Sequence, residues 1–577
     1  MKLHTRTLLS IACLSTLCII PGCTVDDAKK KMDLGVSPIS PALAKSAAFR
    51  DTIGSCAYYE GLAPQRARGY GLVVGLGKNG SGECPRAIRD QLIQSLYKQH
   101  KFSGGPVGEW QIKPEQLIDD PDTAVVVVRA DIPGAVVEGT RVDVYVTALP
   151  GTKAKSLRGG RLFTTELESY RETPSGILPS GTVVAKASGP LLLNPFAEGD
   201  AATQSAPLEA TIVGGGRCTK ARDLRLVLGS ASYGLAQKIQ DRINNRFPKE
   251  RKVADAISPS YIDIHIPKEF HDDTGHFLAL LRSLFLTSEP NFEGMRAKAL
   301  AEELVIPNAP HDLIALALEG LGQAVIPLIS NLYSHQSDHV SFHAAVAGSR
   351  LGDHLAVDAL ALQARKIQGE FRFKAIRAMA QAKGMANASI ALRELLEDDD
   401  PRIQAAAYEA LVERRDAVVR SKSLGGDNFT LDLIPTHNAN RVYAKRSQSR
   451  RIALFGEDHL CDPPVHYVSP DGSFTVNALP EDKQLTLIRV ALADDTRSPP
   501  IPAPLNLSRL IELLGNDADI DADGQVTGLG LDYGSIIRAL QHLCEDRSIN
   551  ASFMLEQPNA AELFGPTRPQ GRPESEL

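Results

Sequence analysis

The order of apolar and polar positions predicts an α/β unit at the start of the chain. Residues 70–74 form an apolar run, a glycine-rich turn follows it, and Pro85 then precedes apolar residues at helical spacing. Short apolar runs and apolar residues repeating every ~3.6 positions are the main sequence signals of strands and helices. We therefore expect an N-terminal α/β domain over residues 48–200. Its expected strands are 70–74, 124–129, 142–148 and 182–187, and its helix carries Ile88, Leu92, Ile93 and Leu96.

A second, smaller α/β module is predicted over residues 205–285. A strand at 223–228 precedes a helix whose apolar face carries Leu235, Ile239 and Ile243. Residues 261–266 then alternate apolar and polar side chains, which is the pattern of a half-buried strand. The pattern of this module is therefore strand, helix and strand.

Residues 300–417 change to a helical pattern with an internal repeat. Ala344, Ala375 and Ala406 recur at equal intervals, each inside a similar segment. Small residues let paired helices approach closely, and repeats of this kind stack into a solenoid. The segment resembles HEAT-type repeats, and an unrelated helical bundle is the alternative. The expected fold class is therefore α/β (α+β) modules plus an all-α HEAT-like solenoid.

Strand character returns after the repeats and predicts a C-terminal module over residues 450–560. A Pro-rich linker at 498–504 separates its strands from its helices. The polar segment 561–577 holds three prolines and is expected to be a disordered tail. The expected strands are 451–455, 473–479, 484–490 and 551–555, and the expected helices are 508–514 and 533–543.

Residues 1–22 have the pattern of a secretory signal peptide. Basic residues precede an apolar run from Leu8 to Ile20, which is too short to span a bilayer as a helix. The run leads into Ile-Pro-Gly-Cys, which resembles the lipobox of bacterial lipoproteins. We therefore expect cleavage before Cys23, acylation of its sulfur and a lipidated tether over residues 23–47. Cleavage nearby without lipid is the alternative.

Composition and charge change this picture mainly by exclusion. A chain of 577 residues is too long for one core, and its formal net charge of −6 argues against nucleic-acid binding, which needs a concentrated basic face. Five cysteines remain after Cys23, which permits two disulfides and leaves one thiol over. These are Cys56, Cys84, Cys218, Cys461 and Cys544, and none belongs to a CxxC pair.

Three motifs imitate ligand sites. Residues 75–80 fit GxGxxG between a strand and a helix, but no strand ending in an acidic residue follows at the distance that a dinucleotide site requires. Residues 519–524 resemble the start of an EF-hand loop, but Gly530 stands where the last carboxylate ligand belongs. His339 and His343 can share a helix face, but no glutamate completes HExxH. We therefore expect no cofactor, no metal and no enzymatic activity.

Two stretches resemble the signature stretches of the flagellar P-ring protein family. The first is GYGLVVGL at residues 69–76, and the second is AKSLRGG at residues 154–160, which follows a predicted strand. Residues 223–267 are similar to the next module of that family, and segments between 461 and 555 are similar to its C-terminal end. The resemblance therefore covers residues 48–285 and 450–556, and the helical repeats fall between these parts.

The resemblance implies a structural subunit of a periplasmic ring around the flagellar rod, which acts as a bushing at the peptidoglycan layer in bacterial motility. The implied partners are further copies of the chain, the rod and outer-ring proteins, the peptidoglycan layer and, through the lipid, a membrane. The alternative is a periplasmic lipoprotein adaptor of the same fold that binds envelope proteins through its repeats, outside the flagellum. The residues implied in ring packing or partner contact are Gly71, Gly75, Gly77, Lys155, Ser156, Leu157, Arg158, Gly159 and Gly160.

Three further expectations follow from the resemblance. Cys461 and Cys544 would lie in one C-terminal unit and form a disulfide, and Cys56 with Cys84 is a second candidate pair. Lys155 and Arg158 would face an acidic neighbour or the rod surface, and simple solvation at a strand end is the alternative. Because the family pattern stops near residue 285 and resumes near 451, we also expect the repeats to be an insertion that folds on its own. The alternative is that the helices complete the cores of the units beside them.

Overall fold

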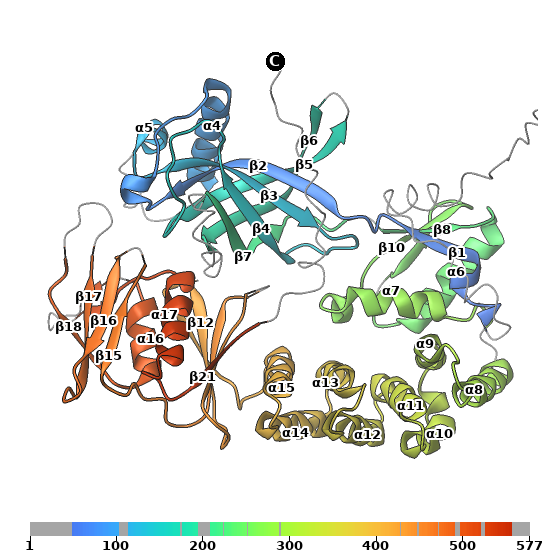
Figure 1. The fold of residues 1–577 in the computed structure, drawn as a ribbon. Helices are drawn as coiled ribbons and strands as arrows, with labels where there is room; N and C mark the ends of the chain where they lie inside the picture. The colour runs from blue at the N-terminus through green and yellow to red at the C-terminus, as the bar shows by residue number, and fades with distance from the viewer. Residues whose placement is uncertain are drawn as a thin grey trace, which may run out of the picture.

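The protein is described here by a computed structural model that mixes helices and sheets in four regions (Figure 1), so the expected combination of α and β structure is confirmed. The signal segment, Cys23, the tether and the tail at 561–577 lie outside the described residues. The described residues are 49–102, 113–173, 176–193, 208–222, 224–250, 252–287, 290–426, 428–446, 449–470, 472–490, 497–517, 519–520 and 526–556.

A closed six-stranded barrel forms the first region. Its strands run in the order β2-β3-β4-β7-β6-β5, and every neighbouring pair is antiparallel. Side chains such as Val126, Val144 and Ile212 pack together as one buried core. The strands are β2 (Gln65–Val74), β3 (Ala124–Ile132), β4 (Arg141–Ala148), β5 (Arg161–Thr173), β6 (Gly176–Pro190) and β7 (Glu209–Cys218).

Two barrel strands differ from the expectation. No strand was expected at β5, where the polar side chains of Thr165 and Ser169 are buried in places that usually hold apolar ones. β7 lies in the range expected for the second module, but it pairs with β4 and β6 and completes the barrel. The barrel therefore ends at Cys218 rather than near residue 200.

Two helices, α4 (Arg86–Phe102) and α5 (Pro114–Asp119), pack on the outside of the barrel. Leu92 of α4 belongs to the same buried cluster as Val125 and Val127 of β3, whereas Val126 faces the barrel core. Successive side chains of a strand point to opposite faces. The apolar run of β3 is therefore explained by burial on both of its faces.

A four-stranded sheet in the order β1-β8-β10-β9 forms the second region. β1 precedes the barrel in the chain, yet it pairs with β8, which follows the barrel. The chain therefore starts in this module, forms the barrel and returns. The elements are β1 (Ala57–Glu60), β8 (Leu224–Leu228), β9 (Ala254–Ala256), β10 (Tyr261–Ile264), α3 (Ile53–Cys56), α6 (Tyr233–Arg246) and α7 (Thr274–Ser283).

Helices form the third region and lie in two rows along the lower edge of Figure 1. Within the described ranges no single helix is long and apolar enough to cross a bilayer, and one sharply bent pair, His311–Leu321 with Gln323–Ser334, reaches that length only in combination. The helices are α8 (Pro290–Leu304), α9 (His311–Leu321), α10 (Ile326–Ile329), α11 (Asp338–Leu351), α12 (His354–Arg365), α13 (Arg372–Gln381), α14 (Ala386–Glu394) and α15 (Pro401–Glu413).

One polar contact recurs through this region. The side chains of Ser341, Arg372 and Gln404 each donate to the backbone carbonyl eight residues earlier, at 2.6, 2.9 and 2.8 Å. The last carbonyls of a helix have no hydrogen-bond donor within that helix. Each of these side chains comes from the next helix and donates a hydrogen bond to one such carbonyl. The three positions are almost equally spaced along the chain, as expected for equivalent places in a repeat.

The buried alanines follow the same spacing. Ala344 and Ala375 are fully buried, as expected, but in the third unit the fully buried alanine is Ala407, and Ala406 is only partly covered. The third unit is therefore displaced by one position from the equal spacing that the sequence suggested.

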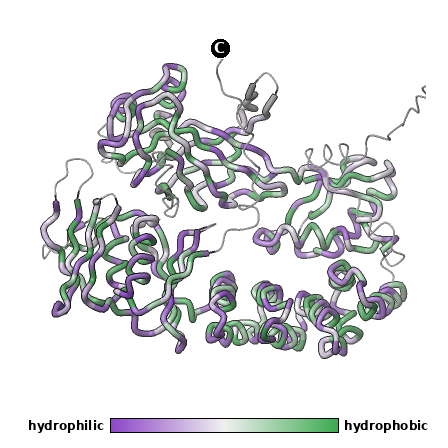
Figure 2. The backbone as a smooth tube through the Cα atoms, in the orientation of Figure 1, coloured by the Kyte–Doolittle hydropathy of each residue, from purple (hydrophilic) through white to green (hydrophobic). Residues whose placement is uncertain are grey.

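Two sheets and two helices form the C-terminal region. The five-stranded sheet has the order β11-β12-β14-β13-β21, the four-stranded sheet has the order β15-β16-β17-β18, and α16 (Leu507–Gly515) and α17 (Tyr533–Glu545) share a core with both. Figure 2 shows hydrophobic and hydrophilic positions alternating along these strands. The strands are β11 (Arg420–Leu424), β12 (Phe429–Ile434), β13 (Arg441–Ala444), β14 (Arg451–Phe455), β15 (Val465–Val468), β16 (Phe474–Ala478), β17 (Gln484–Arg489), β18 (Ile501–Pro504) and β21 (Ser552–Leu555).

Part of this region was not expected from the sequence. The first sheet begins at Arg420, well before the expected start near residue 450. The expected Pro-rich linker contains β18, which pairs only with β17 at the sheet edge. Edge strands tolerate proline because one side of the strand needs no ladder hydrogen bonds.

The helical region shares its core with the regions on both sides. At one end Phe49 and Phe285 belong to the helical core, and at the other end Ile434, Ala453 and Phe455 of the five-stranded sheet belong to it. The structure therefore favours the alternative in which the helices complete the cores of their neighbours.

Candidate functional site

The first signature stretch ends, and the second lies, in adjacent loops at one end of the barrel. The first loop follows β2, and the second lies between β4 and β5. The backbone N–H groups of Lys155 and Ser156 donate to the carbonyl of Asn79 at 2.8 and 3.3 Å, so the second loop is held on the first. We call residues 75–80 and 153–160 together the double loop.

The glycine turn of the double loop binds a carboxylate of its own chain. Gly75 and Gly77 have φ angles of 78° and 57°, which glycine adopts without strain. Their N–H groups both donate to the carboxylate of Asp122, from Gly75 at 3.1 Å and from Gly77 in a shorter bond. The Leu76 N–H donates to the Asp122 carbonyl at 3.0 Å. Asp122 therefore occupies the anion nest that a phosphate would need.

Two of the predicted contact glycines are instead required inside the barrel. A Cβ on Gly160 would lie 2.5 Å from Val73 Cγ1 and 2.7 Å from Leu76 Cδ2. A Cβ on Gly71 would lie 2.9 Å from Leu162 Cδ1. These glycines allow the two loops and the strands beneath them to approach closely.

The remaining predicted residues divide by exposure. Leu157 is fully buried in the barrel core. Ser156 Oγ accepts a hydrogen bond from the Arg158 N–H at 3.1 Å, which shapes the loop. Lys155 and Gly159 are exposed. The outward part of the double loop is therefore Lys155, Arg158 and Gly159.

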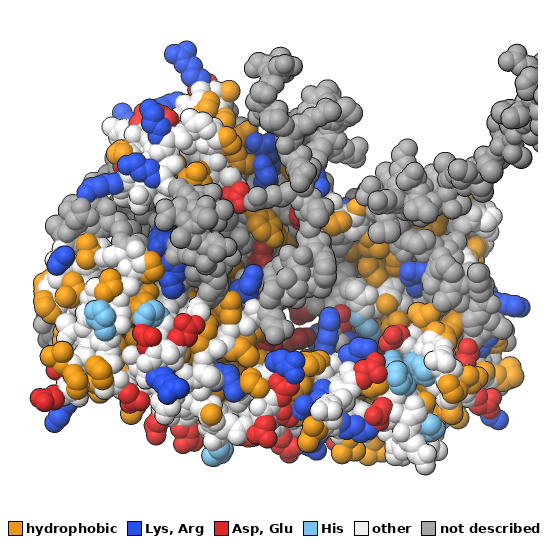
Figure 3. Space-filling model, in the orientation of Figure 1, with side chains coloured by type: hydrophobic (Ala, Val, Ile, Leu, Met, Phe, Trp, Pro, Cys, Tyr) orange, Lys and Arg blue, Asp and Glu red, His pale blue; other side chains and the backbone are white. Residues whose placement is uncertain are grey.

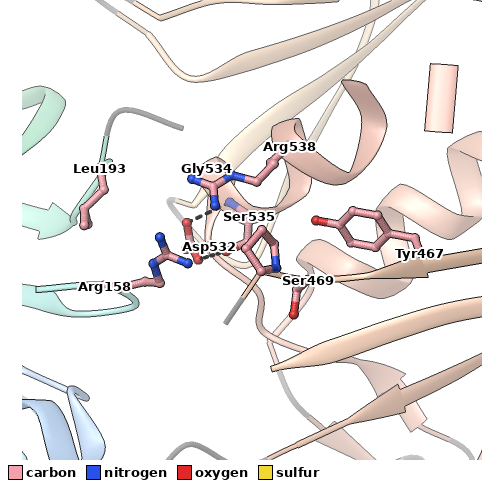
Figure 4. A pocket seen from close by; sticks show the side chains of 9 residues that line it. Arg158, Leu193, Tyr467, Ser469, Asp532, Gly534, Ser535 and Arg538 are labelled. Carbon is pink, nitrogen blue, oxygen red and sulfur yellow. Dashed lines mark hydrogen bonds between the residues drawn. The ribbon is translucent and has the colours of Figure 1, made fainter. Parts of the chain in front are cut away.

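Arg158 faces the C-terminal region of the same chain. In Figure 4 its guanidinium points toward Asp532, the N-cap residue of α17, across a small pocket. Asp532 accepts hydrogen bonds from the N–H and hydroxyl of Ser535 at 3.0 and 2.6 Å. An acidic residue of the same chain therefore lies beside Arg158, and the expected contact of Arg158 with an acidic neighbour or the rod surface stays a prediction. The other residues of the pocket are Leu193, Tyr467, Ser469, Pro470, Gly534 and Arg538.

A second contact supports this docking. A Cβ on Gly534 would lie 2.9 Å from Leu192 Cδ1, so the segment after β6 packs closely on the first turn of α17. An open cleft continues between the double loop and the C-terminal region, and it carries charges of both signs. Its charged residues are Asp122, Arg158, Arg161, Arg489, Asp517 and Asp532.

The described cysteines are free thiols in the structure. Cys461 and Cys544 lie in one core, and the charge of the Cys544 thiolate contributes to the pKa of Cys461. Burial raises the pKa of each thiol to about 12. Cys56, whose pKa burial raises to about 11, lies in the second module, whereas Cys84 packs beside α4. The disulfide between Cys461 and Cys544 stays a prediction.

The imitated ligand motifs contribute no site in the part of the chain that the structure describes. There, no three His, Cys, Asp or Glu side chains are grouped so that they could hold a metal ion. Asp519 and Ile520 form a short strand, β19 (Asp519–Ile520), and residues 521–525 lie outside the described ranges. His339 and His343 do lie on one face of α11, where they meet His311 of α9.

Asp122 is the residue that sequence reasoning missed. Its only signal is its place in the segment Asp-Asp-Pro-Asp, next to an apolar strand. Nothing in that local pattern indicates which N–H groups its carboxylate accepts.

Known proteins match the first half of the chain. A family model described as flagellar P-ring protein matches residues 52–293. The flagellar P-ring protein of Rhodopseudomonas palustris (strain BisB5) is 30% identical over 266 residues, which is 44% of this chain and 65% of that protein. Flagellar P-ring protein 1 of Bradyrhizobium diazoefficiens is 31% identical over 250 residues, 41% of this chain and 61% of that protein. The flagellar P-ring protein of Nitrobacter hamburgensis is 32% identical over 243 residues, 40% of this chain and 58% of that protein.

The chain thus spans roughly three fifths of the length of these curated relatives. The matched residues run from the start of the second module, through the barrel and its double loop, to α8. The match ends at residue 293, so the likeness of residues 450–556 stays a prediction. Over residues 52–293, this chain is similar to the flagellar P-ring protein family.

Proposed function

We propose that this chain is a structural, non-enzymatic subunit of a periplasmic ring around the flagellar rod. The observation that carries the proposal is the family match over residues 52–293, which contains the barrel and the complete double loop. A closed ring needs two different surfaces on each copy, one for each neighbour. Because Arg158 faces its own C-terminal region, the double loop contributes mainly Lys155 and Gly159 to any contact between copies.

The non-enzymatic part of the proposal is supported by the double loop itself. The N–H groups that would bind a nucleotide phosphate donate to Asp122. The glycines at positions 71 and 160 have a packing role. The motif most similar to a ligand site is thus accounted for by the fold.

We further propose that helices α8–α15 are HEAT-like repeats that bind another envelope component. The carbonyl contact and the buried alanines, which recur at nearly equal intervals, support this. The face in Figure 3 interleaves acidic and basic side chains over these helices. Such a surface favours a protein partner over a polyanion.

We also propose that the mature chain is anchored by lipid at Cys23. The Ile-Pro-Gly-Cys end of the signal segment supports it. Labelled palmitate is expected in the wild-type chain and not in Cys23→Ser. Equal labelling of both chains, or of neither, would remove this part of the proposal.

The test of the main proposal is purification of flagellar basal bodies from cells that carry a C-terminally tagged chain. The chain should be enriched with rod and hook, and cells without it should lose motility. A tagged Cys23→Ser chain separates the lipid anchor from the ring function. Loss of the lipid should reduce membrane association, whereas the chain should still be recovered with basal bodies. Recovery of the chain only in other envelope fractions, together with normal swimming of the deletion strain, would contradict the ring function.

A further inference from the structure

Three histidines meet where helices α9 and α11 begin. His311 is the first residue of α9, and His339 and His343 lie one turn apart at the start of α11. The ring centroids are 5.6 Å apart for His311 and His339, 5.4 Å for His311 and His343, and 6.4 Å for His339 and His343. We call these residues the histidine cluster. In Figure 3 histidine side chains appear at the surface over α9 and α11.

His343 lies between two hydrogen-bond acceptors. Its Nδ1 lies 2.7 Å from the carbonyl oxygen of His339, and its Nε2 lies 3.0 Å from a carboxylate oxygen of Asp312. Each oxygen can accept a hydrogen bond from an imidazole N–H. The side chain is 6% exposed, so a positive charge on the ring would be held largely away from solvent.

A positive charge on His311 is disfavoured in this cluster. Burial, followed by His343 and His339, lowers the pKa of His311 below its usual value of 6.5, although a hydrogen bond with the Leu304 backbone of α8 and the charge of Asp312 act in the opposite direction. Glu370 lies 3.5 Å from His339 Nε2. The carboxylate of Asp312 is already engaged by His343.

The other charged groups around the cluster have partners of their own. Asp338, on the first turn of α11, accepts from Lys366 and Gln363. Lys374 of α13 lies 5.3 Å from the centre of the Phe371 ring, whose edge contacts His339. His335, before α11, accepts from the Ser337 N–H at 3.1 Å. Asp312 and Glu370 are therefore the carboxylates that face the cluster.

We propose that the histidine cluster is a pH-sensitive joint, at which protonation of His311 in mild acid loosens the start of α9 from α11. The charged His311 ring would then lie 5.6 Å from the His339 ring and 5.4 Å from the largely buried His343 ring. α9 also packs on α7, so the joint controls how firmly the repeats are held on the second module. This inference does not depend on a flagellar role.

The direction of the pH dependence follows from the lowered pKa. A histidine whose folded pKa lies below its unfolded value contributes full stability above the unfolded pKa, about 6.5. That stability is lost as the pH falls through the folded pKa. The joint should therefore be closed at pH ~7.5 and open measurably at pH ~5.5.

Hydrogen exchange of the full chain, corrected for intrinsic rates, tests the joint. Between pH ~7.5 and ~5.5, protection of α9 and of the first half of α11 should fall relative to α17, by up to about tenfold per pH unit for each proton taken up. The double variant His311→Gln, His339→Gln should lose most of this dependence. The matched control His354→Gln changes an exposed histidine at the start of α12 and should keep it.

Two outcomes would overturn the proposal. One is equal protection of α9 in the wild-type chain at both pH values, a measurement that does not require the double variant to fold. The other is loss of protection at pH ~7.5 on adding EDTA alone, which would identify the cluster as a metal site. A pH dependence that persists unchanged in a folded double variant would assign the effect to other groups.

Discussion

The carboxylate of Asp122 stabilises the glycine turn of the double loop from a distant place in the chain. We expect Asp122→Ala to lower the local stability of the barrel by about 1–3 kcal/mol, because the N–H groups of Gly75 and Gly77 lose a charged acceptor. Asp122→Asn should cost less, since the amide oxygen still accepts one bond. Hydrogen exchange of β2 and β3 measures the effect. Asp90→Ala, on the exposed side of α4, is the control and should change little.

A single methyl group should distinguish the two kinds of glycine in this fold. Gly160→Ala places a Cβ 2.5 Å from Val73 Cγ1, and overpacking of this kind costs about 1–3 kcal/mol. Gly234→Ala adds the same methyl group in open space on α6 and should be neutral or slightly stabilising. Calorimetric unfolding of both variants makes the comparison. Equal stability of the two would show that the double loop is not tightly packed.

The two buried cysteines of the C-terminal region can be tested directly. We expect non-reducing peptide mapping of the exported chain to find Cys461 joined to Cys544, since the exported compartment favours oxidation. If they remain thiols, burial raises their pKa to about 12, so alkylation at pH ~8 should be slow until the chain is unfolded. Rapid labelling of both thiols in the folded chain would contradict both the disulfide and the buried thiols of raised pKa.

Sequence reasoning at the residue scale identified the double loop but not its internal contacts. Gly71 of β2 and Leu157 and Gly160 of the double loop pack inside the barrel, which depends on the distances between strands rather than on the local sequence. Their role in ring packing stays a prediction. Arg158 was assigned an acidic neighbour or solvent, and its neighbour Asp532 comes from the opposite end of the chain. Long-range contacts of this kind leave no local signal.

Among the helices, Arg414 connects the end of α15 to the preceding unit. The spacing of apolar residues along the helices does not indicate this contact. Its Nη1 donates to the carbonyls of Met379 and Ala382 at 3.0 and 2.7 Å, and its Nη2 donates to Met385 at 2.7 Å. The guanidinium thus supplies donors at the C-terminal end of α13. It acts there much as a capping side chain does, although it comes from the end of α15.

We expect Arg414→Lys to destabilise the helical region by about 1.5–3 kcal/mol, because an ammonium group cannot satisfy carbonyls on both sides at once. Arg415→Lys is the matched control, since Arg415 is exposed. Hydrogen exchange of α13 measures the difference. Equal protection in the two variants would show that the contact contributes nothing to the junction of these units.

Helices with a regular spacing of apolar residues were predictable from the sequence. Strands whose position depends on the strands they pair with were not. The helices of the repeats and α4, α6 and α17 follow the 3.6-residue pattern, which needs only local sequence. β5 was missed because polar Thr165 and Ser169 face the barrel interior, and β18 was missed because its prolines suit an edge strand. β7 was assigned to the wrong unit because strand order is a property of the whole barrel.

At the scale of the whole molecule, the helical region connects the second module to the C-terminal region, and the C-terminal region returns to the barrel at Arg158 and Leu192. The sequence suggested that the repeats are an independent insertion. Their last helix, however, is built into the next sheet. The buried Asp432 of β12 accepts a hydrogen bond from Tyr408 Oη of α15 at 2.6 Å, and the Tyr408 ring contacts Phe455 at 5.6 Å between centroids.

Removal of residues 298–420 should therefore destabilise the C-terminal region, contrary to the sequence-based expectation. It would leave Ile434, Ala453 and Phe455 uncovered and remove one partner of a fully buried carboxylate. Burying a carboxylate with fewer hydrogen bonds, together with exposing this apolar face, favours aggregation. We expect the shortened chain to be insoluble, or to show little protection of β12 and β14 in hydrogen exchange.

Removal of residues 341–371 is the matched control. It joins Val340 to Arg372, which are consecutive positions of the repeat, so that one unit is lost while α15 keeps its contacts with the C-terminal sheet. Because stability in a repeat array is approximately a sum over units and their neighbours, this chain should remain soluble with a protected C-terminal sheet. If the chain without residues 298–420 is folded and soluble, the repeats are an independent insertion. The C-terminal sheet would then be stable without its contacts to α15.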